Sequence, residues 1–582
     1  MNSSVVGKFR QVWIAAHSTP FGVLLERHQD RQPPSYSSPS VHLREPPGGR
    51  TPLKAIVVGA GITGITAGIL LPAKVPGLSL TIYERYSDIG GVWHANTYPG
   101  VRCDVPSHVY QSTFSPSTTW TENYSRGAEI NPTGKASQPN TTFVDATWSE
   151  SRAKWTLNIR QIDPTTGIQT TTTDESDFLI LSTGRFSRPT LPEYPGINDY
   201  KGRVIHTGAW VTNFDPAGKK LALIGNGASG LQILPELQKV ASHVDHYTRI
   251  QPGREIPIAE ELKAEWAASS EAYHKYRTGL ESTSWARFAI IEKGGETNNY
   301  AREELTKLMS QRLGERQDLL PLVLPDFAPN CRRLTPGPGY LEALTKDNVD
   351  YIRTPIERFT ETGLRTTDGT ERPVDAVICA TGAVKKQSPA FLIINAQGTN
   401  LQSAWSPGGN PGFPDTYLGV AAPDYPNLLF LLGPNSGSGF AGTVPHTIET
   451  QLTYIAKVLR KVSSQRIRTI TPSHAAIRDF RAYCKSFFPT TILSETCSSW
   501  YNNHTKNGRI VAVWPGSGAH VHYIRKEGNR FGYFGNGWTG RDVRAKEEGV
   551  EGGVDFAYYL KTEASGEMGV DLRGYHEDWW EV

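Results

Sequence analysis

Short apolar runs rich in β-branched residues alternate with longer amphipathic runs in the first half of the chain. Residues 54–59 and 220–225 are predicted to be buried parallel strands, because each is a short, continuous apolar run that enters a glycine-rich turn. Residues 65–71 and 231–240 follow these turns with helical spacing, and residues 78–83 form a further predicted strand. The order strand, turn, helix, strand predicts an α/β fold with parallel sheets.

The rest of the pattern is less regular. Residues 255–324 alternate charged and apolar positions at helical spacing, which predicts a helical cover over a neighbouring site. Residues 1–50 contain a stretch rich in Pro, Ser and Gly and are predicted to be a disordered leader. They hold no basic segment followed by an apolar core, and no run in the chain suits a membrane-spanning helix, so we expect a cytoplasmic protein without integral membrane association.

Composition excludes several function classes. The 582 residues carry 60 Lys and Arg against 57 Asp and Glu, a balance of +3 that disfavours nucleic-acid binding through bulk positive charge. The five cysteines form no CxxC pair and no metal-ligand spacing, so we expect no metal site, no disulfide scaffold and no dithiol reductase. Gly and Pro total 96 residues, more than average usage gives, and this predicts many tight turns.

The first glycine-rich turn has the spacing of a dinucleotide-binding site. It comprises Gly59-Ala-Gly61-Ile-Thr63-Gly64, and Glu84 ends the next predicted strand 20 residues after Gly64. Gly59 permits the tight turn, Gly61 lets the backbone approach a pyrophosphate, and Gly64 lets the helix pack on the strand. The helix N-terminus offers free N–H groups to phosphate, and Glu84 is predicted to accept from ribose hydroxyls.

The second turn, Gly225-Asn-Gly227-Ala-Ser-Gly230, repeats this pattern with one difference. The residue 19 positions after Gly230 is Arg249, whereas the first site has an acid near that position. An arginine suits the 2′-phosphate of NADPH through charge-assisted contacts. Two sites of different chemistry predict two different dinucleotides, with FAD at the first and NADPH at the second.

Four further motifs resemble the flavin-dependent Baeyer–Villiger monooxygenases, and most closely the fungal members of aflatoxin and sterigmatocystin type polyketide secondary metabolism. They are Gly90-Gly-Val-Trp93, Tyr98-Pro-Gly-Val-Arg102-Cys103-Asp104, Gly202-x-x-x-His206-x-x-x-Trp210 and Ala380-Thr-Gly382. The resemblance runs from about residue 54 to the C-terminus. It implies a two-dinucleotide-binding flavoprotein of two Rossmann-like domains. After the leader (1–50), residues 51–199 and 376–582 would build the FAD domain, and residues 200–375 the inserted NADP domain with its helical cover.

In such an enzyme, NADPH reduces FAD and O₂ then adds to give a flavin peroxide. The peroxide attacks a ketone, which becomes an ester or lactone. A fixed cation beside the flavin stabilises the negative charge that develops. The resemblance implies that Arg333 is this cation and that Asp104 holds it, with Arg332 as the neighbouring alternative.

The resemblance also implies a set of cofactor contacts. For FAD these are Gly59, Gly61, Thr63, Gly64, Glu84, Gly90, Gly91, Val92, Trp93, Arg102, Cys103, Asp104, Tyr110 and Val144. For NADPH they are Gly225, Asn226, Gly227, Ala228, Ser229, Gly230, Leu231, Gln232, Arg249 and Ile250. Trp93 and Tyr110 would line the flavin site or belong to the core. His206 and Trp210 would organise the hinge between domains, and Trp500 would form a wall of the site.

Two departures from the family pattern leave alternatives open. Tyr200 stands where the motif before Gly202 begins with Phe, which keeps an aromatic ring. Residues 131–140 are polar and contain two prolines where the family has a helix, so a helix of the FAD domain is predicted to be missing. The alternatives are an N- or S-oxygenating or hydroxylating flavin monooxygenase, which should lack the Arg102–Asp104 and Arg332–Arg333 elements, and an inactive remnant damaged near residues 131–142.

Overall fold

The computed structural model describes residues 50–131, 138–248, 260–383, 388–437, 442–495, 499–502, 505 and 508–526. The predicted leader lies outside these residues except for Arg50, and the predicted NADPH contacts Arg249 and Ile250 lie outside them too. Most of the segment that departs from the family pattern, residues 132–137, is also not described. Whether a helix has been lost there therefore stays a prediction.

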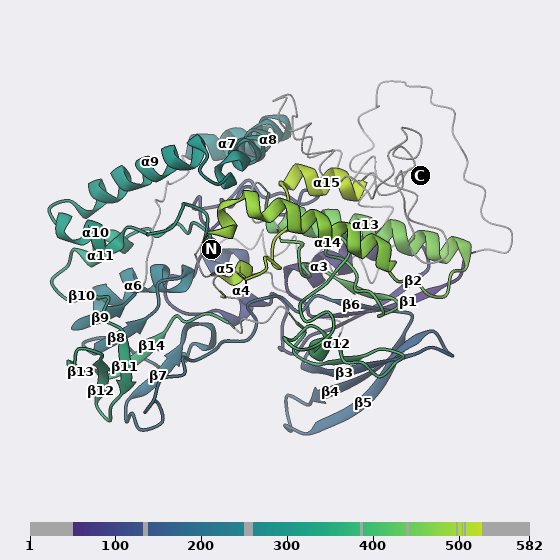
Figure 1. The fold of residues 1–582 in the computed structure, drawn as a ribbon, viewed down its shortest axis with the longest axis horizontal. Coiled ribbons are helices and arrows are strands. Elements are labelled where there is room, and N and C mark those ends of the chain that lie inside the picture. The colour runs from purple at the N-terminus through teal and green to yellow at the C-terminus, as the bar shows by residue number, and fades with distance from the viewer. Residues whose placement is uncertain are drawn as a thin grey trace.

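The first predicted strand and its partners form one parallel sheet in the order β16-β6-β1-β2, seen on the right in Figure 1. Its strands are β1 (Leu53–Val58), β2 (Leu78–Tyr83), β6 (Phe178–Leu181) and β16 (Leu428–Phe430). Helix α3 (Ile62–Lys74) connects β1 to β2 and packs on both. Because β16 follows all strands of the second sheet in the chain, this sheet is built from two distant segments.

The second predicted strand lies at the centre of another parallel sheet, in the order β10-β9-β8-β14-β7, seen on the left in Figure 1. Its strands are β7 (Arg203–His206), β8 (Lys220–Ile224), β9 (His243–Tyr247), β10 (Val349–Ile352) and β14 (Ala376–Cys379), and helix α6 (Ala228–Val240) follows β8. Since β14 pairs with β7 and β8, the boundary predicted before Ala376 is wrong: the inserted domain extends through Cys379.

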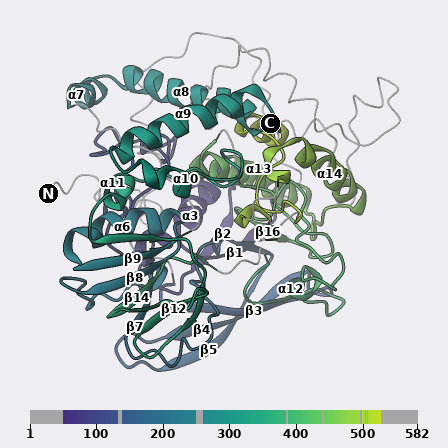
Figure 2. The ribbon, with the colours of Figure 1, turned by 60° about the vertical axis from the view of Figure 1, so that its left-hand side comes forward.

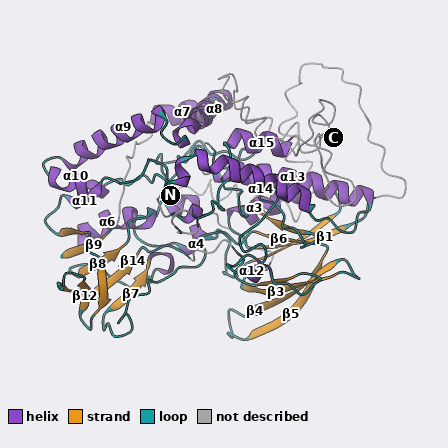
Figure 3. Cartoon of the chain, viewed as in Figure 1, coloured by secondary structure: helices purple, strands orange, loops and turns teal. Residues whose placement is uncertain are grey.

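Two further sheets accompany the parallel ones. The sheet β15-β3-β4-β5 comprises β3 (Thr141–Ser149), β4 (Lys154–Ile162), β5 (Gln169–Ser176) and β15 (Leu392–Ile394). The antiparallel sheet β11-β12-β13 comprises β11 (Ile356–Phe359), β12 (Gly363–Thr366) and β13 (Glu371–Pro373). These strands appear in orange in Figure 3, below the helices.

Helices cover the upper side of both parallel sheets (Figures 1 and 2). Within the predicted cover of residues 255–324, the described part contains α7 (Glu260–Ala268), α8 (Ser270–Ala286), α9 (Glu296–Leu313) and α10 (Leu320–Val323). Over the first sheet lie α13 (Val444–Gln465), α14 (His474–Phe487) and α15 (Gly518–Lys526). Short helices complete the chain: α4 (Val92–Ala95), α5 (Gly127–Ile130), α11 (Tyr340–Leu344) and α12 (Leu401–Ala404).

The largest hydrophobic core joins the two ends of the described chain. It includes Val57 of β1, Leu71 of α3, Leu429 of β16 and Ile455 of α13, all nearly inaccessible to solvent. A separate core lies under α6 and α11 in the inserted domain. The α/β fold with two Rossmann-like units, one inserted into the other, is therefore confirmed. Among the described residues, no helix is long and apolar enough to cross a membrane.

Candidate active site

The first glycine-rich turn is shaped by close backbone contacts. Gly59 has a φ of +104°, and a Cβ added there would lie 2.5 Å from the carbonyl oxygen of Ser182, the residue that follows β6. A Cβ on Gly64 would overlap the carbonyl oxygen of Gly59. The residue before α3 is Gly61, which has no side chain to cap the helix. The N–H groups of the first turn are therefore open to a phosphate ligand, as an FAD site requires.

Glu84 is buried directly beside this turn, with 4% of its surface exposed. Its carboxylate accepts hydrogen bonds from the backbone N–H of Ala60 at 2.6 Å and of Tyr86 at 3.0 Å. The residue thus holds the glycine turn against the end of β2. Its predicted contact with ribose hydroxyls stays a prediction.

The second glycine-rich turn repeats the geometry of the first. Gly225 has a φ of +102°, a Cβ there would lie 2.6 Å from the carbonyl oxygen of Ala380, and a Cβ on Gly230 would overlap the carbonyl oxygen of Gly225. Gly227 precedes α6 without a side-chain cap, and the space around its Cα is open. Both turns therefore offer a helix N-terminus without a side-chain cap, and the space beside Gly227 in the second turn is open to a pyrophosphate.

Arg333 and Asp104 form an ion pair that joins the inserted domain to the FAD domain. Arg333 Nε donates to Asp104 Oδ2 at 2.5 Å and Nη2 donates to Oδ1 at 3.2 Å, which is a two-pronged contact between a planar guanidinium and a carboxylate. The side chains are 32% and 24% exposed, respectively. Asp104 raises the pKa of Arg333 further above its ordinary value, so the guanidinium stays charged at every working pH.

Four aromatic or thiol side chains lie close to this pair. Trp93 Nε1 donates to the hydroxyl of Tyr110 at 3.1 Å, and their rings meet edge to face. Burial raises the pKa values of the Tyr110 hydroxyl and of the Cys103 thiol, so both stay protonated. Tyr501, from the C-terminal part of the chain, is also buried, and its pKa is raised to about 12, mainly by burial. Cys103 therefore lacks the thiolate character of a nucleophile.

Gln232 bridges the two domains. Its side-chain oxygen accepts from the hydroxyl of Tyr98 at 2.7 Å and from the backbone N–H of Arg102 at 3.3 Å, and its amide nitrogen donates to the carbonyl oxygen of Arg102 at 3.0 Å. The side chain of Gln232 thus holds the loop that leads to Asp104, and its predicted contact with NADPH stays a prediction. The guanidinium of Arg102 pairs with Glu122 at 3.2 Å.

The motif that begins at Tyr200 forms the connection into the second sheet. The hydroxyl of Tyr200 donates to the carbonyl oxygen of Val374 at 2.8 Å, so the departure from Phe adds a hydrogen bond. His206 accepts from the N–H of Gly208 at 2.9 Å and caps a short turn that leads to Trp210. His206 thus ends β7 and Trp210 follows the turn after it, and their predicted role in a hinge between the domains stays a prediction.

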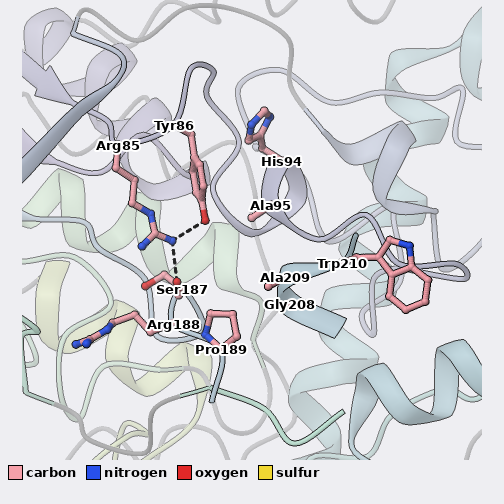
Figure 4. Close-up of a pocket in the computed structure, with 10 residues that line it drawn as sticks. All are labelled: Arg85, Tyr86, His94, Ala95, Ser187, Arg188, Pro189, Gly208, Ala209 and Trp210. Atoms are coloured by element: carbon pink, nitrogen blue, oxygen red, sulfur yellow. Dashed lines mark hydrogen bonds between the residues drawn. The ribbon is translucent and has the colours of Figure 1, made fainter. Parts of the chain in front are cut away.

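A cavity of about 600 Å³ lies next to residues 208–210, between the two domains (Figure 4). Arg85 donates to the hydroxyl of Tyr86 and to the carbonyl oxygen of Ser187, each at 2.7 Å. The cavity contains neither Arg333 nor either glycine turn, so it is separate from the predicted chemistry. Its lining residues are Arg85, Tyr86, His94, Ala95, Ser187, Arg188, Pro189, Gly208, Ala209 and Trp210.

The remaining predicted residues have simpler positions. Leu231 is buried in the core under α6, and Val144 is exposed on β3. The ring of Trp500 is tilted against that of Tyr501 with centroids 4.4 Å apart, and the guanidinium of Arg185 lies 5.7 Å from the Trp500 ring. The guanidinium of Arg332 lies over the ring of Phe327, 4.9 Å from its centroid. Arg333, and not Arg332, is therefore the arginine that pairs with Asp104.

Helix α8 has a buried polar face that the sequence pattern did not single out. Tyr273 and Arg277 are 4% exposed and Glu281 is 2% exposed, although the helix is polar overall. These three residues are spaced by four, which places them on one face of a helix. That spacing was the available signal for a buried face.

Comparisons with known proteins agree with the geometry. Residues 57–126 match the family model described as NAD(P)-binding Rossmann-like domain, and residues 161–251 match Flavin-binding monooxygenase-like. The chain is similar to the FAD-binding monooxygenase tazF of Aspergillus terreus, with 32% identity over 87% of this chain and 94% of that protein. It is also similar to a Baeyer-Villiger monooxygenase of Pseudomonas aeruginosa, with 28% identity over 80% of this chain and 88% of that protein.

Among solved structures, the closed form of cyclohexanone monooxygenase superposes with a TM-score of 0.68 at 22% identity, and the match covers 86% of this chain and 99% of that one. This likeness confirms the nested arrangement of the two dinucleotide folds. The tazF relationship settles the class of the enzyme. The chain belongs to the family of FAD-binding monooxygenases that includes the Baeyer–Villiger monooxygenases, and it is an NADPH-dependent enzyme that consumes O₂ and a small-molecule substrate.

Proposed function

We propose that the enzyme inserts one oxygen atom beside the carbonyl of a bulky ketone and releases an ester or lactone. The observation that carries this proposal is the Arg333–Asp104 pair, a permanent cation fixed where the two dinucleotide domains meet. Negative charge develops on the carbonyl oxygen when a nucleophile adds to a ketone. A cation whose position is already set stabilises that charge without reorganisation.

In this reaction each group would have a separate role. Bound FAD, once reduced by NADPH, would activate O₂, so that one oxygen atom is transferred to the ketone and the other leaves as water. Arg333 stabilises the charge on the reacting oxygen atoms, and Asp104 holds the guanidinium plane through two hydrogen bonds. The N-terminus of α3 would bind the FAD pyrophosphate, and that of α6 would bind the NADPH pyrophosphate. Arg249 would recognise the 2′-phosphate.

The helices α7, α8 and α9 would limit the access of water to the reacting atoms, because water would release the activated oxygen as hydrogen peroxide. Several relatives are fungal FAD-binding monooxygenases, which supports a substrate from fungal polyketide secondary metabolism. An enzyme that consumes NADPH works where that reductant is regenerated, so we also propose a cytoplasmic location.

The experiment is turnover of a panel of polycyclic and cyclic ketones with NADPH and isotopically labelled O₂. We expect one labelled oxygen atom in an ester or lactone product. A thioether and a tertiary amine in the same panel test the related oxygenation chemistries. Exclusive formation of sulfoxide or N-oxide, with every ketone returned unchanged, would contradict the proposal.

A further inference from the structure

Residues 105–117, which follow Asp104 directly, form a loop held by helix α8 of the inserted domain. The hydroxyl of Tyr273 is the centre of this contact. It donates to the carbonyl oxygen of Ser117 at 2.6 Å, accepts from Gln111 Nε2 at 2.6 Å, and lies 2.8 Å from His108 Nδ1. Because the single hydroxyl proton goes to Ser117, His108 must donate from Nδ1, and all three hydrogen-bonding positions of the hydroxyl are used.

His108 is fully buried in this contact. Its ring meets the rings of Trp266, Tyr273 and Tyr276 edge to face, with centroids 4.8, 5.6 and 5.3 Å away. Arg277 adds a hydrogen bond from Nε to the carbonyl oxygen of His108 at 2.9 Å. Side chain and backbone of one loop residue are thus both held by α8. This packing, together with the hydrogen bonds at Nδ1 and at the carbonyl oxygen of His108, fixes the position of the loop.

The same loop is anchored at two more places. Leu280 of α8 packs against the small cluster of Cys103, Val105 and Val109, on either side of Asp104. Farther along, Glu449 of α13 accepts from the backbone N–H of Thr113 at 2.9 Å and from its hydroxyl at 2.7 Å. The loop is therefore fixed between the cover helix and the C-terminal helices of the FAD domain.

We propose that the Tyr273 hydroxyl is a positioning group for oxygen insertion, because its contact with the 105–117 loop sets Asp104 and Arg333 in register. Arg333 and Tyr273 both belong to the inserted domain, whereas Asp104 and His108 both belong to the FAD domain. The ion pair and the Tyr273 contact are two bridges across one domain boundary. When the Tyr273 contact is weakened, the Arg333–Asp104 ion pair loses its fixed geometry.

The inference rests on the proposed function, and it predicts which step suffers. Reduction of the flavin by NADPH does not need the guanidinium to be aligned on a ketone, so its rate should be kept. Oxygen insertion does need that alignment, and a displacement of about 1 Å can cost roughly 10²-fold in rate. The activated oxygen is then lost as hydrogen peroxide while NADPH is still consumed.

The test compares Tyr273→Phe and His108→Phe, which break the same hydrogen bond from opposite sides, with Tyr276→Phe as the matched control. The Tyr276 ring stacks on Trp266 at 4.3 Å, and its hydroxyl makes no hydrogen bond with the described residues. We expect hydrogen peroxide per NADPH to rise about 10-fold or more in the first two variants and to stay unchanged in the control. Combining the two changes should add little to either alone.

Hydrogen exchange of the 105–117 peptide provides a readout that needs no substrate. Faster exchange in Tyr273→Phe together with increased peroxide release and unchanged flavin reduction supports the proposal. Unchanged exchange, or faster exchange with unchanged peroxide release, overturns it. So does an equal loss of flavin reduction and product formation, which would indicate a structural role alone. If the wild-type enzyme oxidises no ketone, the proposed function fails separately, and the exchange result still decides whether the contact holds the loop.

Discussion

Glu281 offers a stability test that depends only on burial. It lies on α8 with 2% of its surface exposed, and its buried carboxylate oxygen Oε2 has no hydrogen-bond partner among the described residues. Burial raises its pKa from 4.5 to about 7, an effect opposed by Arg277 and reinforced by Glu449. The change we consider is Glu281→Gln, which keeps the shape of the side chain and removes the titration.

The direction in which stability changes with pH follows from the number of protons that the folded and unfolded states bind. Between about pH 4.5 and pH 7 the folded protein holds a proton on Glu281 that the unfolded chain has released, so the unfolding free energy falls as the pH rises through this window. A shift of about 2.5 units at about 1.4 kcal/mol per unit corresponds to about 3 kcal/mol. Glu281→Gln should therefore stabilise the protein by up to about 3 kcal/mol above pH 7 and by much less below pH 5.

The measurement is thermal and denaturant unfolding of the FAD-loaded enzyme at about pH 5 and about pH 8. Glu261→Gln, an exposed carboxylate on α7, is the matched control and should change stability equally little at both values. If Glu281→Gln has the same effect at both pH values, the raised pKa of Glu281 is refuted. It is also refuted if the variant is less stable than the wild type at pH 8, because that would show an ionised Glu281 in a favourable pairing.

Further outcomes follow from other contacts. Gly64→Ala should abolish flavin retention, since its Cβ would overlap the carbonyl oxygen of Gly59; a yellow purified protein would contradict this. Burial lowers the pKa of His108 to about 4, so the unfolding free energy should fall as the pH drops from about 6.5 to 4. His108→Asn should flatten that fall by up to about 3 kcal/mol in acid unfolding curves, and an unchanged pH profile would count against the burial argument. Tyr200→Phe should lose about 1 kcal/mol in denaturant unfolding through its hydrogen bond to Val374, and no loss would show that the bond is replaced by water.

The local parts of the fold could be predicted from the sequence. Both strand–turn–helix units have strong local signals, because glycine positions and apolar runs lie close together in the chain. The domain boundary could not be placed, because β14 is a short apolar run that could pair in either parallel sheet. Only its hydrogen bonds with β7 and β8 show where it belongs.

The site was predictable to a similar extent. Family motifs pointed to Arg333 and Asp104, and the structure brings these two residues together. The roles of Gln232 and Tyr273 could not be derived, since their partners lie more than 100 residues away and no spacing rule connects them. Helix α8 also looks solvent-exposed by composition, because its buried face uses Tyr, Arg and Glu in place of apolar residues.

In the proposed reaction Arg333, held by Asp104, is needed for oxygen insertion and not for flavin reduction. Stopped-flow measurement of NADPH-dependent flavin bleaching in Arg333→Ala, together with product analysis under labelled O₂, separates these two steps. We expect flavin reduction within about 10-fold of the wild-type rate, no labelled ester or lactone, and stoichiometric hydrogen peroxide. Labelled product formed at a rate close to that of the wild type would show that Arg333 does not have this role.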